Sequence, residues 1–122
     1  MKAMRLTNHQ KRMKLTKHDK QWLNAFRREL TEKFPGMVER MLIYGSKARG
    51  EATPESDLDV LLIVPDKEAK RTRAMRDIGY LLAAEGFVVP SIMAYTVSEW
   101  ERLKRTGSRF RRAVQRDEVR VL

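Results

Sequence analysis

The chain has 122 residues, and its 26 basic and 16 acidic residues give a formal net charge of +10. This length is typical of one domain with one hydrophobic core. The absence of cysteine excludes disulfides, thiolate metal sites and a cysteine nucleophile. The longest uncharged apolar run, residues 60–64, is far shorter than the ~20 residues that span a bilayer, and the N-terminus lacks the apolar core of a signal peptide. We therefore expect a cytoplasmic protein with no membrane contact and with an anionic partner.

The positive charge is distributed unevenly. Residues 1–20 carry +6 and residues 81–122 carry +3, but residues 51–80 carry −2. An acidic stretch inside a basic chain indicates a specific use for its carboxylates. Residues 1–15 show no helical or strand period, so we predict a disordered basic arm over 1–15 and a single domain over 16–122.

The first half of the chain alternates between helix and strand signals. Thr16 and Asp19 have the spacing of a helix capping box, and the apolar residues that follow recur at helical spacing up to Phe34. A strand is predicted over 38–44, followed by a glycine-rich turn over 45–50. A second strand is predicted over 57–64, and its apolar second half indicates a central position in the sheet.

The second half continues the same alternation. A helix is predicted over 69–85, with Met75, Ile78 and Leu82 on its buried face, and a strand over 87–95 whose proline requires an edge or a bulge. Ser98 and Glu101 are predicted to cap a short helix. Another short helix and a terminal strand at 119–122 complete an α/β (α+β layered) domain, with a mixed sheet of three to five strands flanked by helices.

The turn after the first strand has the composition of a phosphate-binding loop. Gly45 and Ser46 offer backbone and hydroxyl donors at the start of a helix, and Lys47 and Arg49 are expected to place positive charge beside them. The spacing of Gly45 and Gly50 matches a Walker A loop, but the lysine that such a loop requires is absent at position 51. Alone, the turn is a weak signal.

A pair of aspartates opens the second predicted strand. Asp57 and Asp59 are two residues apart, so a strand would direct both carboxylates to the same face. Neighbouring carboxylates repel each other unless a cation lies between them, and Asp is a poor strand residue. Mg²⁺ suits this pair because it takes carboxylate and phosphate oxygens together. Exposure at a loop end would also explain the pair.

Taken together, residues 42–50 (LIYGSKARG) and 56–60 (SDLDV) resemble the signature of the DNA polymerase β-like nucleotidyltransferases, in particular the minimal nucleotidyltransferase (MNT) branch. The resemblance implies a nucleotidyltransferase fold, with Gly45, Ser46 and Arg49 binding the nucleotide. It implies that Asp57 and Asp59 are catalytic, contact the nucleotide and bind Mg²⁺. The implied reaction transfers AMP from ATP to a hydroxyl, with loss of pyrophosphate.

The chain departs from this family at one position. Active members carry a third carboxylate on the next strand, whereas residues 87–95 contain no acid and Ser91 is the polar residue nearest that place. Serine cannot serve as a carboxylate base. This leaves open a catalytically degenerate relative that binds nucleotide without turning it over.

Three functions follow. The family resemblance implies an adenylyltransferase that modifies a partner protein, as in HEPN–MNT toxin–antitoxin pairs, where the partner is a HEPN toxin. The missing carboxylate favours an antitoxin that neutralises such a toxin by binding alone. The net charge favours a nucleic-acid-binding module, although no signature of one is present. Oligomeric state stays open.

Overall fold

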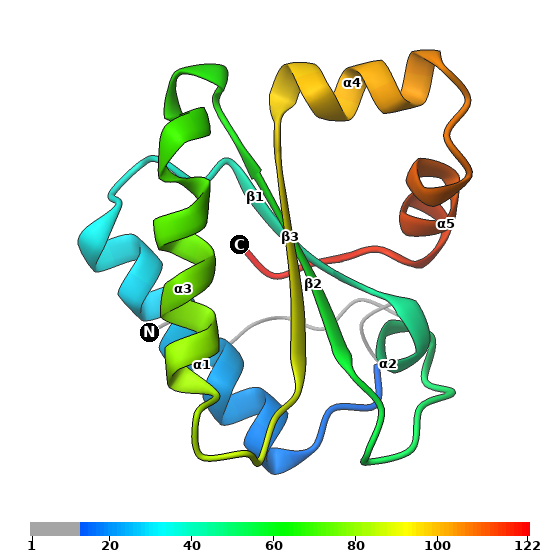
Figure 1. Ribbon diagram of the computed structural model, residues 1–122. Helices are drawn as coiled ribbons and strands as arrows, with labels where there is room; N and C mark the ends of the chain where they lie inside the picture. Colours follow the sequence, from blue (N-terminus) through cyan, green and yellow to red (C-terminus); the bar gives the residue numbers. More distant parts are fainter. Residues whose placement is uncertain (1–12) are drawn as a thin grey trace.

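A four-stranded mixed sheet in the order β3-β2-β1-β4 forms the centre of the protein (Figure 1). The computed structural model describes residues 13–122. The strands are β1 (Arg40–Tyr44), β2 (Leu58–Val64), β3 (Pro90–Thr96) and β4 (Val119–Arg120). β1 pairs antiparallel with both β2 and β4, while β2 pairs parallel with β3. The predicted mixed sheet is confirmed, and so is the central position of the apolar strand β2.

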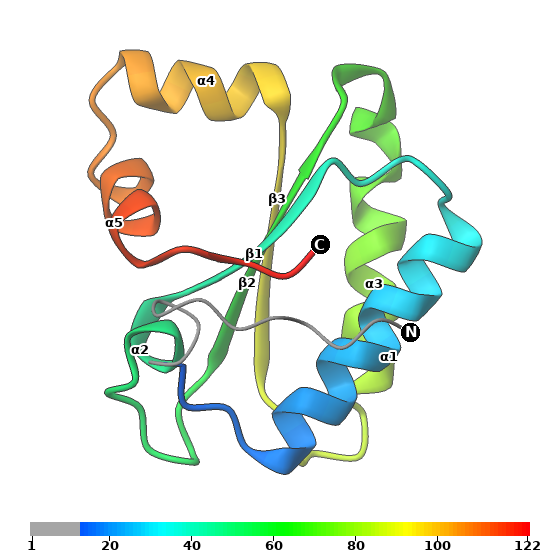
Figure 2. The same ribbon diagram turned by 180° about the vertical axis from the view of Figure 1, so that it is seen from behind.

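Helices cover both faces of this sheet (Figures 1 and 2). One face carries α1 (Lys17–Lys33) and α3 (Thr72–Leu82), and the other carries α4 (Val97–Arg105) and α5 (Arg109–Asp117). The short α2 (Gly45–Arg49) follows β1 directly, and a 3-10 helix, η2 (Asp66–Arg71), precedes α3. Two apolar clusters therefore hold the domain together, one on each side of the sheet.

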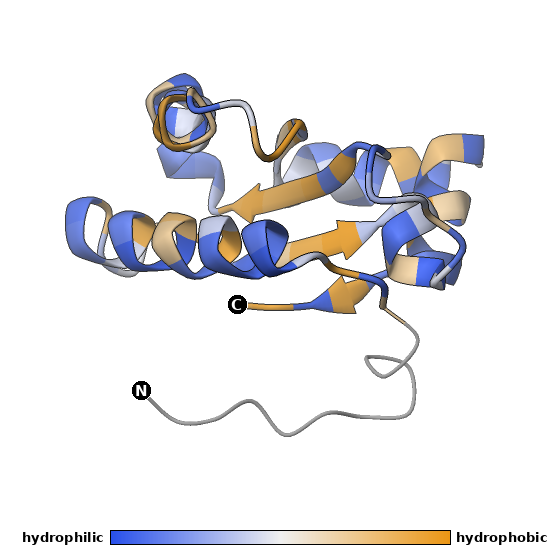
Figure 3. Ribbon diagram, turned by 90° about the horizontal axis from the view of Figure 1, so that it is seen from below, coloured by the Kyte–Doolittle hydropathy of each residue, from blue (hydrophilic) through white to orange (hydrophobic). Residues whose placement is uncertain are grey.

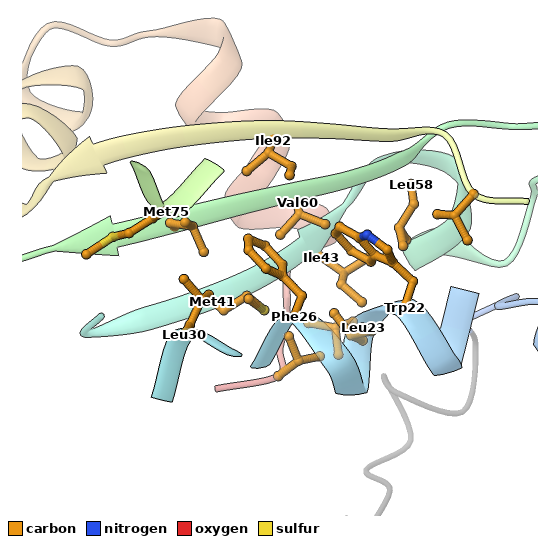
Figure 4. Packing of buried hydrophobic residues seen from close by; sticks show 14 of the residues in the cluster. Trp22, Leu23, Phe26, Leu30, Met41, Ile43, Leu58, Val60, Met75 and Ile92 are labelled. Atoms are coloured by element: carbon orange, nitrogen blue, oxygen red, sulfur yellow. The ribbon is translucent and has the colours of Figure 1, made fainter. Parts of the chain in front are cut away.

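The larger cluster lies between α1 and the sheet. Trp22, Phe26 and Leu30 project from one face of α1 onto the even-numbered side chains of β2, and all of them are buried (Figure 4). Coloured by hydropathy, the strands are mostly apolar, whereas α1 shows polar residues on its outer side (Figure 3). The predicted helical face is confirmed. The predicted capping box is also confirmed, because Thr16 and Asp19 exchange both hydrogen bonds.

The helix predicted over 69–85 differs from the structure. It begins as the 3-10 turn η2 and continues as α3 only from Thr72 to Leu82. Met75 is buried as expected, but Leu82 is 38% exposed, and Gly79 takes the inner position. A Cβ on Gly79 would lie closer than 3.0 Å to the Ile92 side chain, so the close contact between α3 and the sheet requires a residue without a side chain.

The predicted cap of the next helix is two residues too late. The capping box of α4 is formed by Thr96 and Glu99, because the helix continues directly from β3 without an intervening loop. Ser98 instead donates hydrogen bonds from its amide and hydroxyl to Asp66, which ties α4 to η2. Thr96 and Glu99 have the same spacing as Ser98 and Glu101, so the capping pattern occurs twice in this stretch of sequence.

Residues 13–15 contact the domain. Met13 and Leu15 pack against the larger cluster, and the Lys14 amide donates a hydrogen bond to the Lys47 carbonyl at 2.8 Å. The rest of the predicted basic arm, residues 1–12, lies outside the described residues. Within 13–122, no helix is long and apolar enough to cross a membrane.

Candidate active site

The glycine-rich turn forms a sharp connection from β1 into α2. Gly45 has φ of +79°, a left-handed conformation that favours glycine, and Gly50 ends the helix in the same region with φ of +77°. No side chain caps the first turn of α2, and no acidic residue lies in it. The backbone amides at this end therefore face no competing carboxylate within α2.

Asp59 is the second residue of β2 and Asp57 directly precedes the strand, at the same end of the sheet as α2 (Figure 1). Asp59 is opposite Tyr44 of β1 and is paired in register with Ser91 of β3. Leu58 and Val60 point to the other face and are fully buried. Asp57 is exposed and Asp59 is half-buried. The predicted alternation is confirmed for Leu58, Asp59 and Val60, whereas Asp57 lies just before the strand.

Gly45 and Asp59 are in direct contact. A Cβ atom on Gly45 would lie closer than 3.0 Å to Oδ2 of Asp59, so the carboxylate occupies the space that any side chain at position 45 would need. This contact places the glycine turn and the aspartate pair, which are separated in the sequence, in one site.

The electrostatics of the site oppose ionisation of Asp59. Burial raises the pKa of Asp59, the charge of Asp57 raises it further, and Arg49 lowers it. Burial and the charge of Asp59 also raise the pKa of Tyr44 to about 12, so its hydroxyl is neutral at physiological pH. The two carboxylates therefore form a site with unbalanced negative charge, which a cation would relieve.

Lys47 does not contribute charge to the phosphate side of the turn. Its side chain is 3% exposed, and its Nζ atom lies 2.5 Å from Oδ2 of Asp19 in α1. The expectation that Lys47 places its charge beside a bound phosphate is therefore wrong. The periodicity of α2 turns Lys47 inward, where it anchors the helix to α1 through a buried ion pair.

Arg49 belongs to an ion-pair network that the sequence did not reveal. Its guanidinium contacts Asp117 at 2.7 Å and Glu51 at 3.0 Å, and Arg116 also contacts Asp117 at 2.9 Å. Burial alone would raise the pKa of Asp117, but hydrogen bonds from Arg116 and Arg49 lower it overall. Asp117 follows Arg49 by 68 positions, so only the tertiary structure brings them together.

A third carboxylate is not part of the site. Ser91 stands in register with Asp59, and Glu99, the next acid after the strand, caps α4. In the part of the chain that the structure describes, no three acidic or histidine residues are grouped closely enough to hold a metal by themselves. Two carboxylates fit Mg²⁺ if phosphate oxygens and water complete its six ligands.

Comparison with known protein families matches residues 23–116, about three quarters of the chain, to the nucleotidyltransferase domain. The chain belongs to this family. The matched region contains α2, both aspartates and Ser91, whereas Asp19 and Asp117, which hold α2 through ion pairs, lie just outside it.

Two individual proteins are similar to parts or all of this domain. The "putative protein adenylyltransferase" of Methanocaldococcus jannaschii is 39% identical over 44 residues, which span 36% of this chain and 40% of that protein. The crystal structure of a "putative nucleotidyltransferase" from Sulfolobus solfataricus has a TM-score of 0.46 and 19% identity, covering 88% of this chain and 87% of the other. The chain thus spans less than half the length of the curated relative.

Proposed function

We propose that this nucleotidyltransferase transfers AMP from ATP to a hydroxyl group of a partner protein. The observation that carries the proposal is the contact between Asp59 and Gly45, which joins a phosphate-binding turn to a pair of carboxylates. The similarity to a protein named as a protein adenylyltransferase supports the choice of donor and acceptor. We further propose that the partner is a HEPN toxin, which the sequence resemblance implies.

The residues of the site have distinct roles in this proposal. Amides and the hydroxyl at Gly45 and Ser46 bind the triphosphate, and Arg49 places positive charge near its leaving end. Asp57 and Asp59 hold Mg²⁺, which would neutralise charge on the phosphates when bound. Asp117 fixes the guanidinium of Arg49 in position. The raised pKa of Asp59 and its repulsion from Asp57 support a cation at this place.

The reaction balances without a redox step. The acceptor oxygen forms a bond to the α-phosphorus of ATP, and the bond from that phosphorus to the bridging oxygen breaks. Pyrophosphate leaves with the bonding electrons. The proton of the acceptor hydroxyl passes to water, because Ser91 stands where a carboxylate would take it.

A second candidate is neutralisation by binding without catalysis. The observation that favours it is Ser91, since a site with two carboxylates lacks a general base. In this case the chain would bind Mg²⁺ and ATP but leave the partner unmodified.

The experiment compares the full chain with Asp57→Asn/Asp59→Asn in the presence of α-labelled ATP, Mg²⁺ and a HEPN protein encoded next to this chain. Labelled partner with the unaltered chain and none with the variant supports transfer at this site. Equal labelling by both would contradict it. Neutralisation of the toxin by both chains without labelling would favour the second candidate.

A further inference from the structure

Positive charge is concentrated in the segment that runs from the last turn of α4 through α5. Residues 102–116 contain seven lysine and arginine residues and no acidic residue. The two helices meet at a corner on the face of the sheet opposite α1 and α3 (Figures 1 and 2). The proposed function gives these cations no role, so an inference about them does not depend on it.

Most of these cations are exposed and have no acidic partner. We define the cationic corner by the exposed members that form no ion pair within residues 13–122: Arg102, Lys104, Arg105, Arg109 and Arg112. Arg112 donates a hydrogen bond to the Gly107 carbonyl at 3.3 Å, which leaves its charge uncompensated. Arg116 is not a member, because it is paired with Asp117.

Helix stability explains the cations of α4 but not those of α5. Arg102, Lys104 and Arg105 lie in the last turn of α4, where the helix dipole favours positive charge. Arg109 and Arg112 stand at the beginning of α5, which has no acidic residue in its first turn although its dipole favours negative charge there. Like charges three residues apart on one helix also repel each other. This unfavourable placement indicates a function for the arginines of α5.

A buried arginine fixes the two helices of the corner against each other. Arg111 is 7% exposed, and its guanidinium lies over the Trp100 ring of α4, 4.3 Å from the ring centre. Its Nε atom also donates a hydrogen bond to the Trp100 carbonyl at 3.4 Å. The exposed cations therefore stand on a rigid support, which lowers the cost of ordering them when a ligand binds.

The composition of the corner favours a nucleic acid over an acidic protein. Interfaces between proteins have a centre from which charged residues are depleted, whereas interfaces with nucleic acids are strongly positive. Within the part of the chain that the structure describes, no exposed large apolar side chain comes from α4 or α5. Four of the five cations are arginines, whose planar guanidinium groups match phosphate oxygens with two parallel hydrogen bonds.

The aromatic residues of the corner indicate the form of the nucleic acid. Proteins that hold single strands stack the bases on accessible aromatic rings. Trp100 is buried, and Phe110 packs edge to face against it, with 6.3 Å between the ring centres. The corner therefore offers phosphate contacts without a stacking platform, which suits the regular backbone of a double strand.

We propose that the cationic corner binds double-stranded nucleic acid through the phosphates of its backbone, without reading its sequence. Arg109 and Arg112 contact phosphates from α5, and the cations in the last turn of α4 contact neighbouring phosphates. This binding is an activity separate from AMP transfer.

The test measures binding of the full chain to fluorescent probes by anisotropy over a range of salt concentrations. The probes are a DNA duplex, an RNA duplex of the same sequence, an unpaired RNA strand, and a polyglutamate peptide that stands for an acidic protein. The variant Arg109→Gln/Arg112→Gln removes two charges from the corner. The matched control Lys20→Gln/Arg28→Gln removes two charges from exposed positions on α1, across the sheet.

The unaltered chain should bind a duplex at least about tenfold more tightly than the single strand or the peptide. Five cations should give a slope of about −4 or steeper for the logarithm of affinity against the logarithm of salt concentration. Arg109→Gln/Arg112→Gln should make this slope less steep by about 2 and weaken binding at low salt by at least about tenfold, while the control retains both values. The duplex that binds more tightly identifies the nucleic acid as DNA or RNA.

Urea denaturation shows that the variant is folded, because removing like charges from the beginning of α5 should leave its stability equal or higher. Equal weakening in the variant and the control would assign binding to net charge alone and overturn the inference. Tightest binding of the peptide would assign the corner to an acidic protein, and tightest binding of the unpaired strand would exclude a double strand; either result would also overturn it. None of these outcomes bears on AMP transfer, which the labelling of a partner protein tests separately.

Discussion

At the scale of single residues, the contact between Gly45 and Asp59 determines the geometry of the site. Position 45 requires glycine for two separate reasons. Its backbone is left-handed, and the Asp59 carboxylate occupies the space that a side chain would need. Gly107 provides a matched comparison, because it has φ of +71° but, among the described residues, no atom from elsewhere in the chain lies within 4 Å of the place that a Cβ would take.

We expect Gly45→Ala and Gly107→Ala to have similar effects on stability but different effects on ligand binding. Each places alanine in a left-handed conformation, at a cost of about 1–2 kcal/mol. Only Gly45→Ala also displaces the Asp59 carboxylate, so it alone should weaken ATP binding by about tenfold or more. Urea denaturation and calorimetric titration measure the two effects. Equal ATP affinity in both variants would contradict the importance of the contact.

Asp59 is expected to reduce the stability of the free protein. Its pKa is raised in the folded state, so ionising it costs folding free energy, and the cost is present at neutral pH and fades as pH falls through the ordinary carboxyl range. Asp59→Asn should therefore raise the melting temperature at pH 7 by a few degrees, equivalent to less than ~1 kcal/mol because the group is partly solvated. The difference between the two proteins should disappear in acid. A lower melting temperature for Asp59→Asn at pH 7 would contradict this.

Ser91 offers a gain-of-function test. Because it is paired in register with Asp59, Ser91→Asp would place a third carboxylate beside the first two. General-base catalysis contributes about 10²–10⁴-fold in favourable cases, so we expect the rate of AMP transfer to rise by at least about tenfold. Ser91→Asn, which has the same shape without the charge, is the control. Equal rates for the two variants would show that a base at this position does not limit transfer.

At the scale of elements, α2 is fixed from two sides. The buried pair of Lys47 and Asp19 ties it to α1, and the ion pair of Arg49 and Asp117 ties it to α5. Asp19 also accepts a hydrogen bond from the Thr16 amide in the capping box. One carboxylate therefore caps the start of α1 and also holds α2 in place. The orientation of the phosphate-binding turn therefore depends on helices from both ends of the domain.

Breaking the buried pair should be costly. Lys47→Met leaves Asp19 buried without its partner, and such changes cost about 3–5 kcal/mol. The double variant Asp19→Asn/Lys47→Met should recover a part of this loss, since no uncompensated charge is then buried. Urea denaturation of the single and double variants gives the coupling energy between the two residues. Simple additivity of the two substitutions would contradict a direct interaction.

Much of the element order could be predicted from the sequence because local patterns determine it. Apolar residues at helical spacing predicted the buried face of α1, and the apolar run of β2 predicted its central position. The predicted cap of α4 at Ser98 was wrong, because Thr96 has the same spacing to an acid and the position where β3 ends, which no local pattern records, makes Thr96 the cap.

For the site, local signals indicated some residues and gave no sign of others. Composition and strand alternation indicated Gly45, Asp57 and Asp59 as candidates, and the family resemblance implied that they act together. The inward direction of Lys47 and the contact between Arg49 and Asp117 depend on how α1 and α5 pack, which no local pattern records. Ser91 was found through the family resemblance, and its pairing with Asp59 became visible only in the register of the sheet.

At the scale of the whole molecule, charge is distributed unevenly along the chain. Outside residues 77–101 the chain carries 26 basic and 12 acidic residues, while that segment carries four acidic residues, no lysine or arginine, and the exposed large apolar residues of the described chain. If the proposed function holds, the positive net charge is expected to favour the approach of an anionic nucleotide.

The most direct measurement of the central claim is calorimetric titration of the protein with ATP in the presence and absence of Mg²⁺. We predict Mg²⁺-dependent binding that weakens about tenfold to a hundredfold in Asp59→Asn, because a charged contact of this kind contributes ~1.5–3 kcal/mol. Glu55→Gln removes an exposed charge from the loop before Asp57 and should bind ATP unchanged. Binding that is independent of Mg²⁺, or equally strong in Asp59→Asn and the unaltered chain, would contradict nucleotidyl transfer at this site.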